Sequence, residues 1–185
     1  MLQLITAPTS EPVTLAEQKL HSRVDISDDD TYISALITAA RQYAEGYQHR
    51  ALLTQTWRLT LDYFPSVIMV PMPPLRSVTS IQYLDSVGTL QTLSSSAYVV
   101  GTDGAPGLIY PVFGTQFPVA QAQLQSVKVT FQAGYDTVPQ ATKAAIMMIA
   151  DHLYRNRAAV TEGSLNEVPL GAKALLDFNR WGAYA

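Results

Sequence analysis

The stretch FQAGYDTVPQATKAAIMMIADHLYRNR, residues 131–157, decides the predicted fold because it joins the end of a strand to a long, mostly apolar helix. The preceding run alternates apolar and polar residues, which predicts a strand that ends at Gly134. Pro139 suits the first position of a helix, where its missing N–H is harmless. Helical spacing of apolar residues then predicts a helix from Gln140 to Asn156. A helix this apolar must be covered on more than one side, by the sheet and another helix and, we hypothesise, by a neighbouring subunit.

Two further helices are predicted before residue 50. Thr14 and Glu17 have the spacing of a capping box at the start of the first. The second carries apolar residues at helical spacing over 33–47, with Ser27 as its expected N-cap. Between about 55 and 134 the period changes to two, beginning around Trp57, and short antiparallel strands are expected.

These patterns predict an α+β fold that is mainly helical. The N-terminal helix pair and the long C-terminal helix are expected to pack together, with an antiparallel β insert between them. We predict a single domain over 1–185, because this length suits one core. Its parts are helices at about 14–50, the β insert at about 55–134, the long helix at about 139–157, and a flexible or docking tail at about 158–185.

Composition limits the classes of function. The 185 residues include 12 basic, 15 acidic and no cysteine, with a net charge of −3, so a cysteine-based site or a basic DNA-binding face is not expected. Between Ser86 and Val127 the only charged residue is Asp103. This shortage of charge predicts either a surface covered by another copy of the chain or a set of neutral loops. The longest apolar run is too short to span a bilayer, and we expect a soluble protein.

Motifs for chemistry are absent from the sequence. The three histidines form no metal-binding pair, the aspartates at 25–30 lack the calcium-loop pattern, and GTDGAPG is not a phosphate-binding loop. No nucleophile elbow is present. We therefore expect no catalytic, cofactor-binding or metal-ligating residues, and no enzyme activity.

The order and spacing of four segments carry a resemblance. They are VTLAEQKLHSRVDISDDDTYISALITAARQYAEGY (13–47), LLTQTWRLTLDYFP (52–65), VPMPPLRSVTSIQYLDSVG (70–88) and VKVTFQAGYDTVPQATKAAIMMIADHLYRNR (127–157). Together they resemble the head–tail connector (adaptor, or head completion) family of tailed bacteriophages and prophages. The structural motif residues that match are Trp57, Pro73, Pro74, Leu75, Gly134, Tyr135 and Pro139.

The resemblance implies a structural virion protein at the capsid–tail junction, assembled in the bacterial host cytoplasm. Its members form a ring, expected to hold twelve copies, that binds the portal protein and a downstream tail or stopper protein. DNA passes through the channel without sequence-specific binding, and neither a cofactor nor a membrane is involved. Candidate subunit or portal contacts are Arg155, Arg157, Leu175, Leu176, Phe178 and Trp181. The alternatives are another tail-completion or tail-tube component, or a small-molecule binding module.

Overall fold

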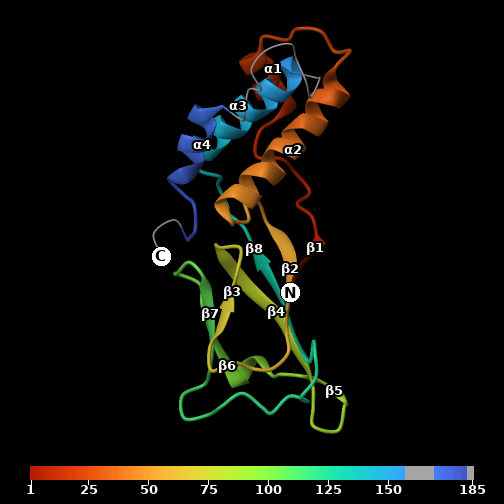
Figure 1. Ribbon diagram of the computed structural model, residues 1–185, viewed down its shortest axis with the longest axis vertical. Coiled ribbons are helices and arrows are strands. Elements are labelled where there is room, and N and C mark those ends of the chain that lie inside the picture. The colour runs from red at the N-terminus through yellow and green to blue at the C-terminus, as the bar shows by residue number, and fades with distance from the viewer. Residues whose placement is uncertain (157–168, 183–185) are drawn as a thin grey trace. The chain divides into compact units, whose positions relative to one another are not determined.

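The computed structural model describes residues 1–156 and 169–182, and the chain divides into two compact units (Figure 1). Unit 1 comprises Met1–Pro8 and Thr54–Asp136, and unit 2 comprises Thr9–Leu53 and Thr137–Ala185. Unit 1 contains β1 (Leu2–Thr6), β2 (Gln55–Leu61), β3 (Ile68–Val70), β4 (Leu75–Leu84), β5 (Leu90–Thr92), the 3-10 turn η1 (Ser95–Ala97), β6 (Tyr98–Gly101), β7 (Gly107–Pro111) and β8 (Val127–Ala133). Unit 2 contains α1 (Leu15–Ser22), α2 (Asp30–Gln48), α3 (Gln140–Arg155) and α4 (Leu170–Asp177).

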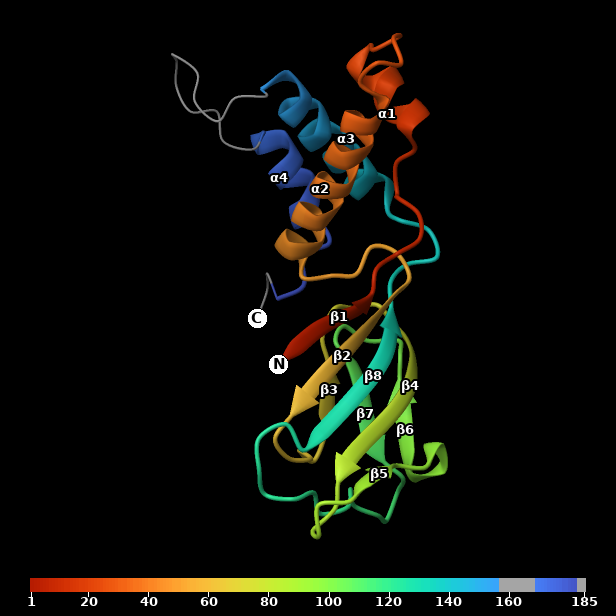
Figure 2. The ribbon, with the colours of Figure 1, turned by 90° about the vertical axis from the view of Figure 1, so that its right-hand side faces the viewer.

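Unit 1 is a sandwich of two antiparallel sheets. One sheet has the strand order β1-β2-β8-β4-β5 and the other β3-β7-β6, and Figure 2 shows the second sheet behind the first. The inward side chains of β8, from Val127 and Val129 to Phe131 and Ala133, are fully buried. The alternation read from the sequence therefore places these residues in the core, as predicted.

The two sheets are in close contact at Gly107 of β7. A methyl group added to its Cα would lie 2.4 Å from Cδ2 and 2.6 Å from Cβ of Leu75, at the start of β4. No side chain larger than hydrogen fits there unless Leu75 and its strand move. Glycine at this position is therefore what lets the sheets approach each other.

Unit 2 is a helical bundle in which α3 packs against α1, α2 and α4. The core between α2 and α3 includes Ile33, Ile37, Ala145 and Ile149, all nearly or fully buried. At Gly171 of α4, an added methyl group would lie 3.2 Å from Cε of a methionine on α3, so the two helices are in close contact. Part of the broad apolar surface predicted for α3 is thus covered within the chain, whereas Ala144, Met147, Met148 and Leu153 are half-buried, and a neighbouring subunit on this helix stays a prediction.

The prediction of a mainly helical fold is wrong. The described residues are 32% helical and 26% strand, with eight strands in two sheets rather than a small insert. The sequence reading missed β1 and β5, whose residues are mostly exposed and so lack the buried alternation that marks a strand. The N-cap assigned to Ser27 is also wrong, because α2 begins at Asp30 with Asp29 as its N-cap.

The predicted boundaries of the other elements agree closely with the structure. The capping box of Thr14 and Glu17 is present, with the Glu17 backbone N–H donating to the Thr14 hydroxyl at 3.1 Å. The predicted tail from 158 falls partly outside the described residues, and its described part contains α4. That one domain spans 1–185 stays a prediction.

The sheet contact can be tested with two Gly→Ala substitutions. Gly107→Ala should destabilise the protein by about 1–3 kcal/mol, because the new methyl group overpacks the sandwich. Gly46→Ala is the matched control: this glycine lies in α2 with nothing within 4 Å of an added methyl group, and alanine should stabilise the helix by about 1 kcal/mol. Urea unfolding measures both changes. An unchanged midpoint for Gly107→Ala would show that the sheets do not meet as described.

Candidate functional site

Several of the sequence-predicted motif residues meet where the chain leaves β8. The Gly134 N–H donates to the Pro74 carbonyl at 2.9 Å, and Leu75 lies opposite Ala133 in the β4–β8 pairing. Gly134 is buried with φ of +130°, a conformation that favours glycine over other residues. Pro73, which precedes Pro74 in the sequence, is also buried. These residues fix the end of the central strand, which is a structural role.

The other motif residues lie on either side of this point in the chain. Trp57 is half-buried in β2 opposite Phe131, and its indole N–H is buried with no hydrogen-bond partner among the described residues. Tyr135 is half-buried, and Pro139 is the N-cap of α3 rather than its first residue.

The candidate contact residues near the C-terminus fall into different environments. Leu176 is fully buried in unit 2, so its side chain is not available to a partner, and Leu175 and Trp181 are half-buried. Phe178 is 78% exposed. Arg155 is exposed and pairs with Asp151 at 2.8 Å, while Arg157 lies outside the described residues.

Hydrogen bonds hold the end of α4 against α2. The buried Gln48 side chain donates to the Leu176 carbonyl at 2.7 Å, and the Trp181 N–H donates to the Gln48 carbonyl at 2.9 Å. The Tyr47 hydroxyl donates to Asp177 at 2.8 Å, and this bond raises the pKa of Tyr47. The Arg180 guanidinium lies 4.9 Å from the centre of the Tyr47 ring. Phe178 is therefore presented to solvent from a well-anchored segment.

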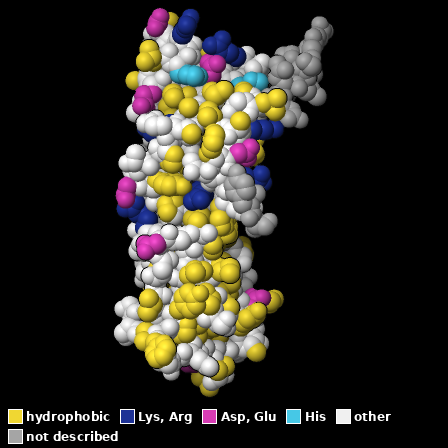
Figure 3. Space-filling model, turned by 90° about the vertical axis from the view of Figure 1, so that its left-hand side faces the viewer, with side chains coloured by type: hydrophobic (Ala, Val, Ile, Leu, Met, Phe, Trp, Pro, Cys, Tyr) yellow, Lys and Arg dark blue, Asp and Glu magenta, His cyan; other side chains and the backbone are white. Residues whose placement is uncertain are grey.

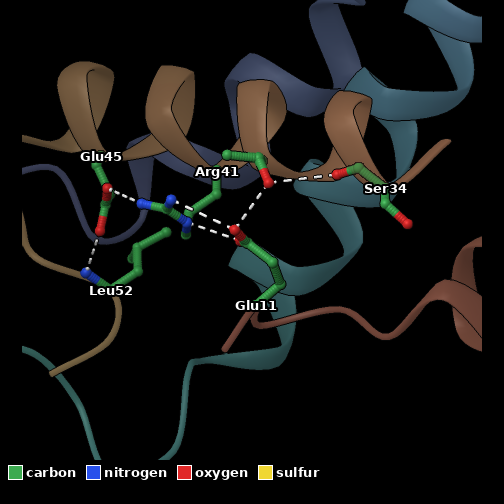
Figure 4. A network of polar contacts seen from close by, with 6 residues as sticks. Glu11, Ser34, Arg41, Glu45 and Leu52 are labelled. Atoms are coloured by element: carbon green, nitrogen blue, oxygen red, sulfur yellow. Dashed lines mark hydrogen bonds and ion pairs between the residues drawn. The ribbon is translucent and has the colours of Figure 1, made fainter. Parts of the chain in front are cut away.

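A buried arginine organises the interior of unit 2 (Figure 4). Arg41 is 5% exposed and donates to Glu11 and Glu45, in each case over 2.7 Å. The other carboxylate oxygen of Glu45 accepts from the Leu52 backbone N–H at 3.0 Å. Burial opposes the charged form of Arg41, but its bonds to Glu11 and the charges of both glutamates outweigh it and raise the pKa of Arg41.

The network joins segments that adjoin the boundaries of unit 2. Glu11 follows the entry of the chain at Thr9, Arg41 and Glu45 lie on α2, and Leu52 precedes the exit after Leu53. Arg41 and Glu45 thus tie the two ends of the segment Thr9–Leu53 to α2. We see this as the polar anchor of the unit, not as a catalytic group.

Unit 1 has an unusually uncharged surface. It holds only seven of the chain's 12 basic and 15 acidic residues, namely Arg58, Asp62, Arg76, Asp85, Asp103, Lys128 and Asp136. Figure 3 shows a face of the molecule on which hydrophobic side chains gather over unit 1 and charged ones are sparse. Several large apolar side chains in this unit are at least half exposed, including Tyr63, Met69, Val99, Phe113 and Val119. Such surfaces mark interaction sites in soluble proteins.

Two adjoining grooves lie on unit 1, sharing Tyr63 and Pro65. The larger, of about 590 Å³, runs along Phe64 and Phe117, whose rings stack with their centres 5.0 Å apart. The smaller, of about 460 Å³, includes Asp62. Neither gathers the paired acids and bases that catalysis requires.

The groups with shifted pKa values have structural causes. The pKa of Glu17 is lowered by the backbone N–H of Thr14, and that of Asp85 by the side chain of Gln91. Burial raises the pKa of Tyr98. None of these groups lines either groove. Within the described ranges there is no cluster of His, Cys, Asp and Glu able to hold a metal ion, and no helix with the length and apolarity to cross a bilayer.

Residues 12–81 match the sequence model of a family described as phage gp6-like head-tail connector protein. The match runs from α1 through α2 into β4 and confirms the resemblance found in the sequence. No curated protein sequence matches the chain.

Solved structures of gene transfer agent (GTA) particles share the fold. The chain is similar to a component of the neck of an empty GTA particle computed with C6 symmetry, at 22% identity and a TM-score of 0.79, over 97% of this chain and 95% of that one. A component of the virion of the native particle is 24% identical to this chain, with a TM-score of 0.81 over 97% of this chain and 95% of that one. A component of the neck of the native particle, computed with C12 symmetry, is 23% identical to this chain, with a TM-score of 0.78 over 97% of this chain and 94% of that one.

The Arg41 network predicts a large loss of stability on removal of its cation. Arg41→Met should cost about 3–5 kcal/mol, because it removes the cation that compensates the buried carboxylate of Glu45. Arg155→Met removes an exposed helix pair with the same spacing and should cost at most about 0.5 kcal/mol. Thermal and urea unfolding compare the two variants. Equal small losses would contradict an anchoring role for Arg41.

Proposed function

We propose that this chain is a structural subunit of a phage or prophage head–tail connector. Copies form a ring between the portal and the tail, and the ring extends the channel for the genome. The family match over residues 12–81 carries this proposal, and the fold shared with GTA neck components over nearly the whole chain supports it. The site of action is then the capsid–tail junction of the virion, after synthesis in the host cytoplasm.

The ring is proposed to contain twelve copies. The structures of the similar neck components were computed with C6 and C12 symmetry, which are compatible with that number. A ring of identical subunits needs two different, complementary faces on each subunit. The uncharged surface of unit 1 supports such faces because burying it between copies removes few charges from water.

A structural role without catalysis agrees with the chemistry of the described residues. The matched family is named for its place between head and tail, not for a reaction. Unit 1 contributes only three cationic side chains, those of Arg58, Arg76 and Lys128. If this unit lines the channel, the scarcity of cations lets DNA slide, because phosphate contacts to basic side chains are what hold it.

The contacts to the portal and to the next tail or stopper protein are proposed to involve the C-terminal segment. Phe178 is the strongest candidate among the residues described there, because it is large, apolar and exposed on an anchored segment. The exposed Arg155 and the half-buried Leu175 and Trp181 remain candidates, and Arg157 is proposed on the sequence alone.

Electron microscopy of the purified chain mixed with portal rings tests the proposal. We expect an added ring layer on the portal, with a six-fold or twelve-fold arrangement. Portal rings that gain no density at any protein concentration would contradict the connector function.

A point substitution tests the docking role of Phe178. Phe178→Ser should lower incorporation onto portal rings at least tenfold while leaving the melting temperature unchanged, because the side chain is 78% exposed and contributes little to the core. Leu20→Ser is the control: Leu20 is 83% exposed on α1 of the same unit. Normal incorporation of Phe178→Ser would remove this residue from the interface.

A further inference from the structure

The edge strands of the sandwich in unit 1 are uncharged. Four strands pair on one side only: β1 and β5 in the larger sheet, and β3 and β6 in the smaller. Such edges offer free N–H and C=O groups, and soluble proteins usually protect them with charged residues, proline or bulges. None of these four strands contains a charged residue.

Two of the edges are long enough to pair with another strand. β1 has five residues and β6 has four, whereas β3 and β5 have three each. Both longer strands also expose apolar side chains: Leu4 and Ile5 of β1 are 41% and 42% exposed, and Val99 of β6 is 56% exposed.

The hydrogen bonds of β1 show which of its backbone groups face away from the sheet. Met1 and Thr60 exchange two bonds, each of 2.8 Å, and so form a hydrogen-bonded pair. Such pairs alternate along an antiparallel ladder. Leu2 and Leu4, one and three positions further on, therefore direct their N–H and C=O groups outward. The bulge in β1 follows Leu4 and leaves this stretch regular.

The same argument applies to β6. The Val112 N–H donates to the Ala97 carbonyl at 3.1 Å, so the next residue, Tyr98, lies at a pair that is not hydrogen-bonded. Its partner is Pro111, which has no N–H to donate. Tyr98 and Val100 therefore direct their backbone groups outward, with the same two-residue spacing as Leu2 and Leu4.

We infer that neighbouring copies of this chain join through a heterologous contact made by strand pairing, in which the β1 edge of one copy lies against the β6 edge of the next. This inference rests on the proposed ring. The two edges lie on opposite sides of the sandwich, as Figure 2 shows, and a heterologous contact needs two such different faces. Pairing of two β1 edges would instead create a two-fold dimer, which does not propagate into a ring.

The pairing satisfies the outward groups of both strands. Two residues on each edge, each with one N–H and one C=O, make about four hydrogen bonds between copies. The contact buries no charged side chain of either strand, so it carries no desolvation penalty for an unpaired ion. Leu4, Ile5 and Val99 lose exposed apolar area in the same step.

A disulfide cross-link tests this geometry. Gln3 and Val99 lie at the centres of the two free stretches and face each other if the strands pair antiparallel. In parallel pairing a residue with outward groups lies opposite one without them, and Gln3 then faces Val100. In either arrangement the Cα atoms of opposite residues lie about 4.5–5 Å apart, which a disulfide can span. The chain has no cysteine, so Gln3→Cys combined with either Val99→Cys or Val100→Cys has no background.

Assembled rings of one of these two double variants, mildly oxidised and run on a non-reducing gel, should give a ladder that extends beyond dimers. Each single variant should give at most dimers. Rings that form normally on the portal but yield no ladder would overturn the strand pairing and leave the connector function intact. Wild-type chain that never joins a portal ring would contradict the connector function itself.

A second variant removes the backbone donor without cysteine chemistry. Leu4→Pro lacks the outward N–H and should abolish ring formation on the portal, whereas Leu4→Ala keeps that N–H and should still assemble. Circular dichroism and the melting temperature check that both variants remain folded. Ring formation by a folded Leu4→Pro variant would count against pairing at β1.

Discussion

The pairing of β8 with β2 on one side and β4 on the other is the constraint on which unit 1 depends. All seven residues of β8 have a partner in β2, and the same strand runs beside β4 from Leu75 to Tyr83. Its inward side chains are fully buried against the second sheet. The position of β2 in turn orders β1, and the end of β8 leads through Gly134 to α3. Both the core and the outer edges of the sandwich therefore follow from one central strand.

Unit 2 depends on polar as well as apolar burial. Arg41 lies inside the unit because Glu11 and Glu45 compensate its charge, and Glu45 in turn holds the Leu52 backbone. A buried ion is costly unless all its partners are present, so the network favours one arrangement of the entry and exit segments around α2. The helices thereby form a defined body, on which α4 and the exposed Phe178 are anchored.

The contrast between the units bears on function. Unit 2 carries most of the charge, whereas unit 1 combines uncharged edge strands with exposed apolar side chains. An isolated protein gains nothing from such edges, since they invite unwanted pairing. A subunit that is covered by its own copies can keep them. The proposed connector ring thus accounts for the composition of unit 1 without any reaction chemistry.

The sequence by itself determined the elements whose signal is local. The helix from Gln140, the strand ending at Ala133 and the capping box at Thr14 all follow from periodicity or from side chains a few residues apart. The resemblance to the head–tail connector family was also evident from the sequence. Only the tertiary structure decided the rest. β1 exists because residues 50 or more positions away pair with it, Leu176 is buried because α4 folds onto α3, and Arg41 is internal because Glu11, 30 positions away, joins the nearby Glu45 in compensating its charge. These features depend on partners remote in the chain, and no local pattern encodes them.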